Sequence, residues 1–236
     1  MDFLITQARL ANATSLQARP YADQPDALGL LDTRGFRETM RMIGLELGDV
    51  RSATVGPVAD VRRALDEKGL HITTLAEQLE SHPGIWAGLL AANQAAQIGW
   101  PDPDPRTDGR PYEPQTVEEF RRRCEETGVI GQACFIAAAG DRFVGYSMLT
   151  ATDPGGVQAG SGGTAVLPEY RGLGVATALK ACCVAWARDT GIRRLVISSG
   201  NPAMVRVNEK LGFRRTYTEV RLVKWFSDAT VGAEDR

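Results

Sequence analysis

An arginine and two closely spaced glycines stand where a strand gives way to a helix, in the stretch Val166–Lys180, VLPEYRGLGVATALK. The first N–H groups of a helix have no partner inside the helix and carry about half a positive charge. A phosphate bound there satisfies these donors, and Gly172 and Gly174 let the backbone approach its oxygens closely. Arg171 can add a charge-assisted hydrogen bond. The turn is therefore a candidate diphosphate site, although a plain helix start fits the same residues.

This turn does not match the two common signatures of nucleotide-binding loops. No Gly-Lys-Ser/Thr follows it, so it is not a P-loop. Thr177 stands where the third glycine of a G-x-G-x-x-G loop belongs, and no ribose-binding acid lies about 20 residues further on. A nucleotide-binding oxidoreductase is accordingly a weak alternative.

The elements around the turn predict a mixed order of strands and helices. Two strands joined at Gly140-Asp141 precede a third strand, which ends at Pro168. A helix that ends at Gly191, a strand, a helix capped by Asn201 and a closing strand follow. The order βααβββαβαβ predicts an α/β (α+β) fold. We expect a mixed, mostly antiparallel, twisted sheet of about six to seven strands with helices on its faces.

The block from Thr164 to Phe213 closely resembles the GNAT superfamily of acetyl-CoA-dependent N-acetyltransferases. The turn Arg171–Ala176 is similar to the Q/R-x-x-G-x-G/A pyrophosphate loop of that superfamily. Val166-Leu167-Pro168 is similar to its splayed central strand, which pairs with the pantetheine arm. NPAMVRVNEKLGF, which begins at Asn201, is similar to its second motif. The resemblance covers roughly residues 69–226.

The resemblance implies acetyl-CoA as the co-substrate, with no metal, and transfer of an acetyl group to an amine. The backbone N–H near Val166 is then expected to hold the thioester carbonyl and stabilise its oxyanion. Gly172–Thr177 are expected to bind the diphosphate, and Asn201 the pantetheine or the far end of the cofactor. The residues expected to bind the cofactor are Thr164, Ala165, Val166, Arg171, Gly172, Leu173, Gly174, Val175, Ala176, Thr177, Asn201 and Asn208.

The general acid is the point where this sequence departs from the superfamily. Asn208 occupies a position where many members have a tyrosine. The CoA thiolate, whose thiol has a pKa of about 8.5 if judged by cysteine, can leave with Asn208 as a hydrogen-bond donor. Otherwise Tyr146, Tyr170 or Tyr217 serves as the acid, or the site is slow or inactive. The alternative function is therefore a catalytically weak or inactive CoA-binding module, used as a sensor or subunit.

No general base stands out in the sequence. The central strand carries Gly160-Ser161-Gly162-Gly163 where relatives often have a carboxylate. A water relayed through Ser198 or Ser199 is one candidate, and capping of the strand end by these hydroxyls is the other interpretation. The expected catalytic residues are thus Asn208, Val166 and Ser198.

The chain also contains an internal similarity. Residues 30–47 resemble residues 207–224 with an offset of 177, since 212 − 35 = 177 for the two Gly-Phe-Arg triplets. The layout is similar to the tandem, mycothiol synthase-like members of the superfamily. We expect residues 1–48 to be a partial repeat with a closing helix and strand only, 49–68 a linker and helix, and 69–236 a complete acetyltransferase domain. A natural truncation and a longer reading frame are both compatible with this start.

Composition and charge restrict the partners and the compartment. The 236 residues carry a net charge of −2 and are 43% hydrophobic, which favours a soluble protein and gives no sign of nucleic acid or membrane as a partner. The start has no signal-peptide pattern. The cysteines, Cys124, Cys134, Cys182 and Cys183, have no C-x-x-C spacing and indicate a reducing, cytoplasmic location. Two histidines make a His-based triad or metal cage improbable.

The acceptor is expected to be a small-molecule amine of unidentified structure. In this fold the acceptor pocket is built from the early helices and from loops, here including the proline-rich segment Pro101–Pro114. A homodimer through the closing strand or the N-terminal fragment is possible.

Overall fold

The computed structural model describes residues 1–82, 84–97, 116–152 and 156–226. These residues form two compact units. Unit 1 consists of residues 1–43 and 217–226, and unit 2 consists of residues 44–97 and 116–216, within the described ranges. The strands β2 (Arg37–Leu47) and β8 (Arg214–Trp225) each run from one unit into the other.

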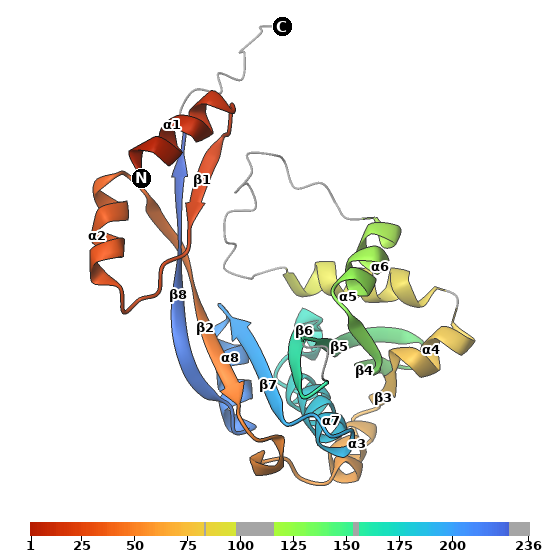
Figure 1. The fold of residues 1–236 in the computed structure, drawn as a ribbon. Helices are drawn as coiled ribbons and strands as arrows, with labels where there is room; N and C mark the ends of the chain where they lie inside the picture. Colours follow the sequence, from red (N-terminus) through yellow and green to blue (C-terminus); the bar gives the residue numbers. More distant parts are fainter. Residues whose placement is uncertain (83, 98–115, 153–155, 227–236) are drawn as a thin grey trace, which may run out of the picture. The chain divides into compact units, whose positions relative to one another are not determined.

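Unit 2 carries the glycine turn and most of the predicted elements (Figure 1). Its helices are η1 (Val50–Ser52), α3 (Val58–Asp66), α4 (Leu75–Ser81), α5 (Ile85–Gln97), α6 (Val117–Glu126), η2 (Pro168–Tyr170), α7 (Val175–Asp189) and α8 (Pro202–Lys210). Its complete strands are β3 (His71–Thr74), β4 (Val129–Ala139), β5 (Arg142–Ala151), β6 (Gln158–Val166) and β7 (Arg194–Ser199).

The strands of unit 2 are hydrogen-bonded in the order β7-β6-β5-β4-β3. The pairs from β3 to β6 are antiparallel, whereas β6 and β7 are parallel. In all, the described residues form eight strands in an open, mostly antiparallel sheet, which confirms the predicted fold class with slightly more strands than expected.

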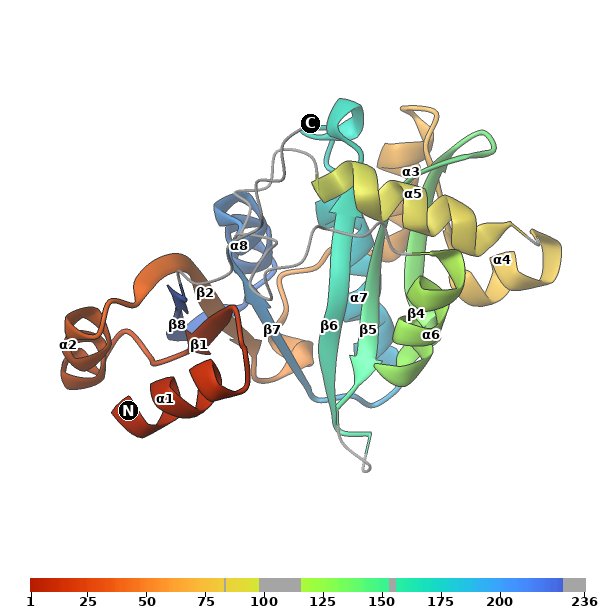
Figure 2. The ribbon, with the colours of Figure 1, turned by 90° about the horizontal axis from the view of Figure 1, so that it is seen from above.

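Helices α5 and α7 cover opposite faces of this sheet, as Figure 2 shows. Successive side chains of a strand point to opposite faces. Tyr146 of β5 accepts a hydrogen bond from Asn93 of α5, while its neighbour Ser147 contacts Cys183 of α7. The face under α5 forms an apolar core with Ile85, Leu89, Phe120, Ile136 and Met148 among its members.

Helix α7 is buried along most of its length, and this burial holds its first turn in a fixed place. Val175, Leu179, Cys182 and Cys183 form an apolar stripe along the helix, and all four are at most 3% exposed. Trp186, one turn further along the helix, is only partly buried.

Two segments of unit 2 differ from the sequence-based expectation. Helix α4 was not predicted from the sequence, where the β-branched residues Ile72, Thr73 and Thr74 favour a strand. Thr74 and Glu77 form a capping box that ends this strand early and begins the helix. The expected linker contains the turn η1, whose buried Val50 donates its N–H to the carbonyl oxygen of Arg193 at 2.9 Å.

Unit 1 contains α1 (Asp2–Leu10), β1 (Ser15–Ala18), α2 (Pro25–Thr33) and parts of β2 and β8. The sequence analysis predicted only the closing helix and strand here, α2 and β2. Strand β1 pairs antiparallel with β8, from Ser15 opposite Trp225 to Ala18 opposite Leu222. A small core of Leu31, Phe36, Val220 and Leu222 lies within this unit.

Candidate cofactor groove

The turn before α7 has the backbone that a close ligand approach requires. Gly172 and Gly174 have φ of +79° and +88°, in the left-handed region that favours glycine. A β-carbon at either position would meet no heavy atom within 4 Å, so open space lies next to both. No described side chain caps the start of α7. The donors of this helix start are therefore available to an anion.

Two side chains hold the turn in position without filling it. Arg171 donates from Nε to the carbonyl oxygen of Val166 at 3.2 Å, which ties the turn to the end of β6. Lys68 donates from Nζ to the carbonyl oxygen of Leu173 at 2.8 Å. The Leu173 side chain is 40% exposed and stays outside the groove described next.

A groove of about 420 Å³ lies over this turn. Ten of the twelve expected cofactor residues line it, namely Thr164, Ala165, Val166, Arg171, Gly172, Gly174, Val175, Ala176, Thr177 and Asn201. The lining also includes Tyr170, Ala203, Met204, Val207 and Lys210. Two of these described lining residues are basic, Arg171 and Lys210, and none is acidic, so the groove suits a polyanion.

The groove lies where β6 and β7 separate. The pairs of these parallel strands end at Gly160 opposite Val196. Beyond this pair, β6 continues to the groove residues Thr164–Val166, and β7 leads to α8, which supplies the other wall. The separation of β6 from β7 therefore corresponds to the splayed strand expected from the sequence. The groove between β6 and α8 has room for an extended ligand.

The sequence analysis missed most of the α8 wall. Ala203, Met204, Val207 and Lys210 follow the three- and four-residue spacing that places side chains on one face of a helix. Steps of three residues from Asn201 lead to Met204, Val207 and Lys210, and this spacing indicates which face of α8 lines the groove. Lys210 is the important omission, because it adds a second positive charge to the groove.

The comparisons decide the family. The sequence profile of the acetyltransferase (GNAT) family matches residues 92–213, which is 122 of 236 residues and just over half of the chain. The chain belongs to the acetyltransferase (GNAT) family. Members of this family in general use acetyl-CoA, which agrees with a groove suited to a polyanion.

Three solved structures share the fold of this GNAT chain at low sequence identity. A GCN5-related N-acetyltransferase from Sphaerobacter thermophilus is 20% identical with a TM-score of 0.66. The match covers 95% of this chain and 64% of the solved chain. A tandem GNAT protein from the clavulanic acid biosynthesis pathway is 17% identical with a TM-score of 0.60, covering 93% and 66%. A GCN5-related N-acetyltransferase from Kribbella flavida is 18% identical with a TM-score of 0.52, covering 89% and 68%.

The chain thus spans about two thirds of the length of these solved chains, between 64% and 68%. None of the curated proteins compared with the chain matches it. None of the described helices has the length and apolar character needed to cross a membrane. Across the described ranges, no group of three or more His, Cys, Asp or Glu side chains is placed to hold a metal ion.

Asn208, which the sequence analysis expected at the tyrosine position of the family, has a side chain that does not line the groove. It is 0% exposed, and its Nδ2 donates to the carbonyl oxygen of Met204 at 2.8 Å. Its Oδ1 is buried without a hydrogen-bond partner. The structure therefore does not bring Asn208 to the groove lining, because its amide is bound within α8 and faces an interior cavity, and its role as cofactor ligand and donor to the leaving thiolate stays a prediction.

The two serines at the end of β7 also lie outside the groove lining. Ser198 is exposed and does not line the groove, so the geometry gives no support to its expected role in a water relay. Ser199 accepts a hydrogen bond at Oγ from the N–H of Asn201 at 3.1 Å. The hydroxyl of Ser199 therefore caps the strand end, which was the structural alternative.

Of the three candidate tyrosines, Tyr170 is the one that lines the groove. The guanidinium of Arg142 lies over its ring, 5.8 Å from the centroid. Tyr146 is 4% exposed, and burial raises the pKa of its hydroxyl above the ordinary value of a tyrosine. Tyr217 is 44% exposed and belongs to unit 1, where its ring meets that of Tyr21. The proline-rich segment Pro101–Pro114, expected near the acceptor, lies outside the described residues.

Asn201 has a structural role besides lining the groove. Its Oδ1 accepts from the N–H groups of Ala203 at 2.9 Å and Met204 at 3.4 Å, as an N-cap of α8. Asn201→Ala is expected to lower the free energy of unfolding by about 1 kcal/mol, because it removes this cap. Asn201→Asp keeps the cap and is the matched control. Urea unfolding of both variants checks this, and equal stability of Asn201→Ala and the original protein contradicts it.

Proposed function

We propose that this chain is an acetyl-CoA-dependent N-acetyltransferase that acts on a small-molecule amine. The observation that carries the proposal is the groove at the start of α7, with uncapped helix donors, open space at Gly172 and Gly174 and no acidic lining residue among those described. These features fit the diphosphate of CoA. The bound thioester supplies an activated acetyl group next to the acceptor.

The residues of this chain act mainly by positioning the two reactants. The turn 171–177 and Lys210 anchor the diphosphate, and the opening between β6 and α8 directs the pantetheine arm inward. We propose that the backbone N–H near Val166 binds the thioester carbonyl and stabilises the oxyanion as the amine attacks. Holding the amine against the thioester supplies much of the rate. Tyr170, which lines the groove, is the best-placed tyrosine to assist the leaving thiolate.

We further propose that residues 1–48 are a partial repeat of the segment from α7 to β8. Adding the offset of 177 to the bounds of α2, 25–33, gives 202–210, which are the bounds of α8. For β2, 37–47, the same addition gives 214–224, and β8 spans 214–225. For α1, 2–10, it gives 179–187, which lies inside α7. We assign no cofactor to residues 1–48, because their helices and strand match α7, α8 and β8 and not the turn before α7.

We also propose a cytoplasmic location. The four cysteines are free and buried, and a reducing compartment maintains such thiols.

Release of free thiol from acetyl-CoA in the presence of a panel of amines tests the proposed function. We expect thiol release with at least one amine, together with CoA binding in calorimetry. The alternative, a CoA-binding module without turnover, is favoured by the absence of a tyrosine at position 208. Binding of CoA without thiol release from any amine in the panel would support that alternative and contradict the transferase.

A further inference from the structure

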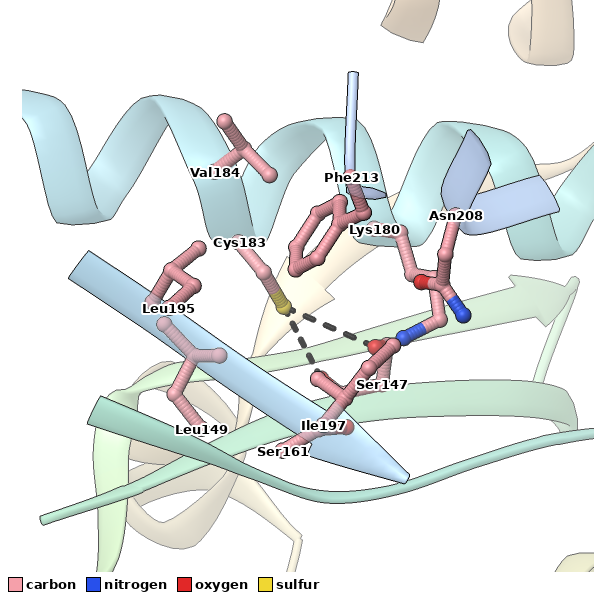
Figure 3. Close-up of a pocket in the computed structure, with 10 residues that line it drawn as sticks. All are labelled: Ser147, Leu149, Ser161, Lys180, Cys183, Val184, Leu195, Ile197, Asn208 and Phe213. Atoms are coloured by element: carbon pink, nitrogen blue, oxygen red, sulfur yellow. Dashed lines mark hydrogen bonds between the residues drawn. The ribbon is translucent and has the colours of Figure 1, made fainter. Parts of the chain in front are cut away.

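Lys180, a buried lysine in the middle of α7, does not line the cofactor groove. Lys180 is 6% exposed, and no carboxylate is among the described residues that line its cavity. Ser147 and Asn208 line the same cavity, which has a volume of about 10 Å³, the size of about one water molecule. Figure 3 shows these three side chains reaching into it from α7, β5 and α8. A buried, uncompensated cation is costly, and this cost calls for a functional reason.

The cavity lies at the base of the opening between β6 and β7. Ser161 and Ile197 line it, and they are the first residues beyond the last strand pair, Gly160 opposite Val196. Further along β6, Thr164 lines the groove. The cavity and the groove are therefore successive spaces along the same separating strands.

Two hydroxyl groups connect these spaces. Ser147 lines the cavity, Thr164 lines the groove, and their Oγ and Oγ1 atoms are 2.9 Å apart. A hydroxyl donates one hydrogen bond and accepts others, so each can take up a proton on one side and release one on the other. The sequence of β6 offers no carboxylate near this point, since residues 160–163 read Gly-Ser-Gly-Gly.

We propose that Lys180 is the proton acceptor of the acetyl transfer and that it acts on the groove through the hydroxyls of Ser147 and Thr164. This inference rests on the proposed function. As the amine nitrogen bonds to the acetyl carbon and the C–S bond breaks, the proton on that nitrogen passes through the two hydroxyls. It then passes through one water molecule in the cavity that Ser147 and Lys180 both line, and reaches neutral Lys180. The CoA thiolate departs and takes a proton from solvent, and Lys180 returns its proton by the same path.

The surroundings of Lys180 suit this task. Burial lowers the pKa of its ammonium to about 8, so a useful neutral fraction exists near neutral pH. Cys183 is the other titratable group lining the cavity, and burial raises the pKa of its thiol to about 12. The strands and α8 add only hydroxyls, an amide and apolar groups to the described lining. Elsewhere on α7, β4 brings Cys134 towards Cys183, and α3 brings Arg62 beside Cys182.

The test compares the pH dependence of kcat in Lys180→Met and in Thr164→Val, both close in shape to the original side chains. In the original protein kcat is expected to rise with pH through a midpoint near 8. Each variant is expected to lower kcat about 100-fold at pH 8 and to lose this pH step. The Kd of acetyl-CoA is expected to change little in Lys180→Met, because Lys180 does not line the groove. Thr164→Ser retains the hydroxyl and is expected to restore the step. The double variant is expected to be no slower than either single one.

Lys224→Met, in unit 1, is the matched lysine control and is expected to keep both kcat and its pH dependence. An unchanged pH profile in Lys180→Met, or in Thr164→Val should the first variant not fold, overturns the inference and leaves the transferase standing. An original protein that binds CoA and releases no thiol with any amine overturns both.

Discussion

Gly174→Glu is expected to raise the dissociation constant of CoA about 100-fold, equivalent to about 2.7 kcal/mol. Gly174 is the N-cap residue of α7, and the space beside it is open in the structure. A carboxylate placed there occupies the volume proposed for the diphosphate. It also repels the phosphate charges at short range, where two unit charges near a protein surface interact by a few kcal/mol. Titration calorimetry with CoA measures the change.

Gly191→Glu is the matched control for this prediction. Gly191 follows the C-terminal end of the same helix, has φ of +85° and has equally open surroundings. Both substitutions therefore introduce the same backbone strain and the same charge. Only the first of them is at the groove, so Gly191→Glu is expected to bind CoA as the original protein does. Equal Kd values of CoA for the two variants would contradict the proposed binding of the diphosphate at the start of α7.

The turn at Arg171–Ala176 was predictable because its requirements are local. Positive φ at two glycines, an uncapped helix start and a preceding strand are all encoded within a few residues. The capping of α8 by Asn201 was predictable for the same reason. Hence ten of the twelve expected cofactor residues line one groove.

The catalytic expectations depend on long-range packing, which no local sequence pattern specifies. Whether Asn208 faces the groove or the interior depends on how α8 is seated over β7 and α7. The interior location of Lys180 could not be predicted either, since a lysine in a helix is exposed by default. Strand β1 escaped prediction because four residues, SLQA, are too short to show a clear alternation.

The buried position of Lys180 has a measurable consequence for stability, independent of any substrate. An exposed lysine keeps its proton up to pH about 10.5, whereas burial lowers the pKa of Lys180 in the folded chain to about 8. Between these two values the unfolded chain binds more protons than the folded chain, so the contribution of Lys180 to stability rises with pH. Below pH 8 the destabilisation is complete, and the difference in pKa corresponds to about 3 kcal/mol.

Lys180→Met is accordingly expected to raise the free energy of unfolding by up to about 3 kcal/mol at pH 7, and by progressively less as the pH approaches 10. Methionine has a similar length and leaves no buried charge, and its flexible side chain fits an irregular cavity. Urea unfolding at pH 7 and pH 10 measures the gain, with Lys224→Met showing no such pH-dependent gain. A gain that is absent at pH 7, or equal at both pH values, would show that the Lys180 ammonium is solvated and would also remove the physical basis for its lowered pKa. A Lys180→Met variant that is more stable and slower in acetyl transfer would show that the buried amine lowers stability and serves the proton transfer.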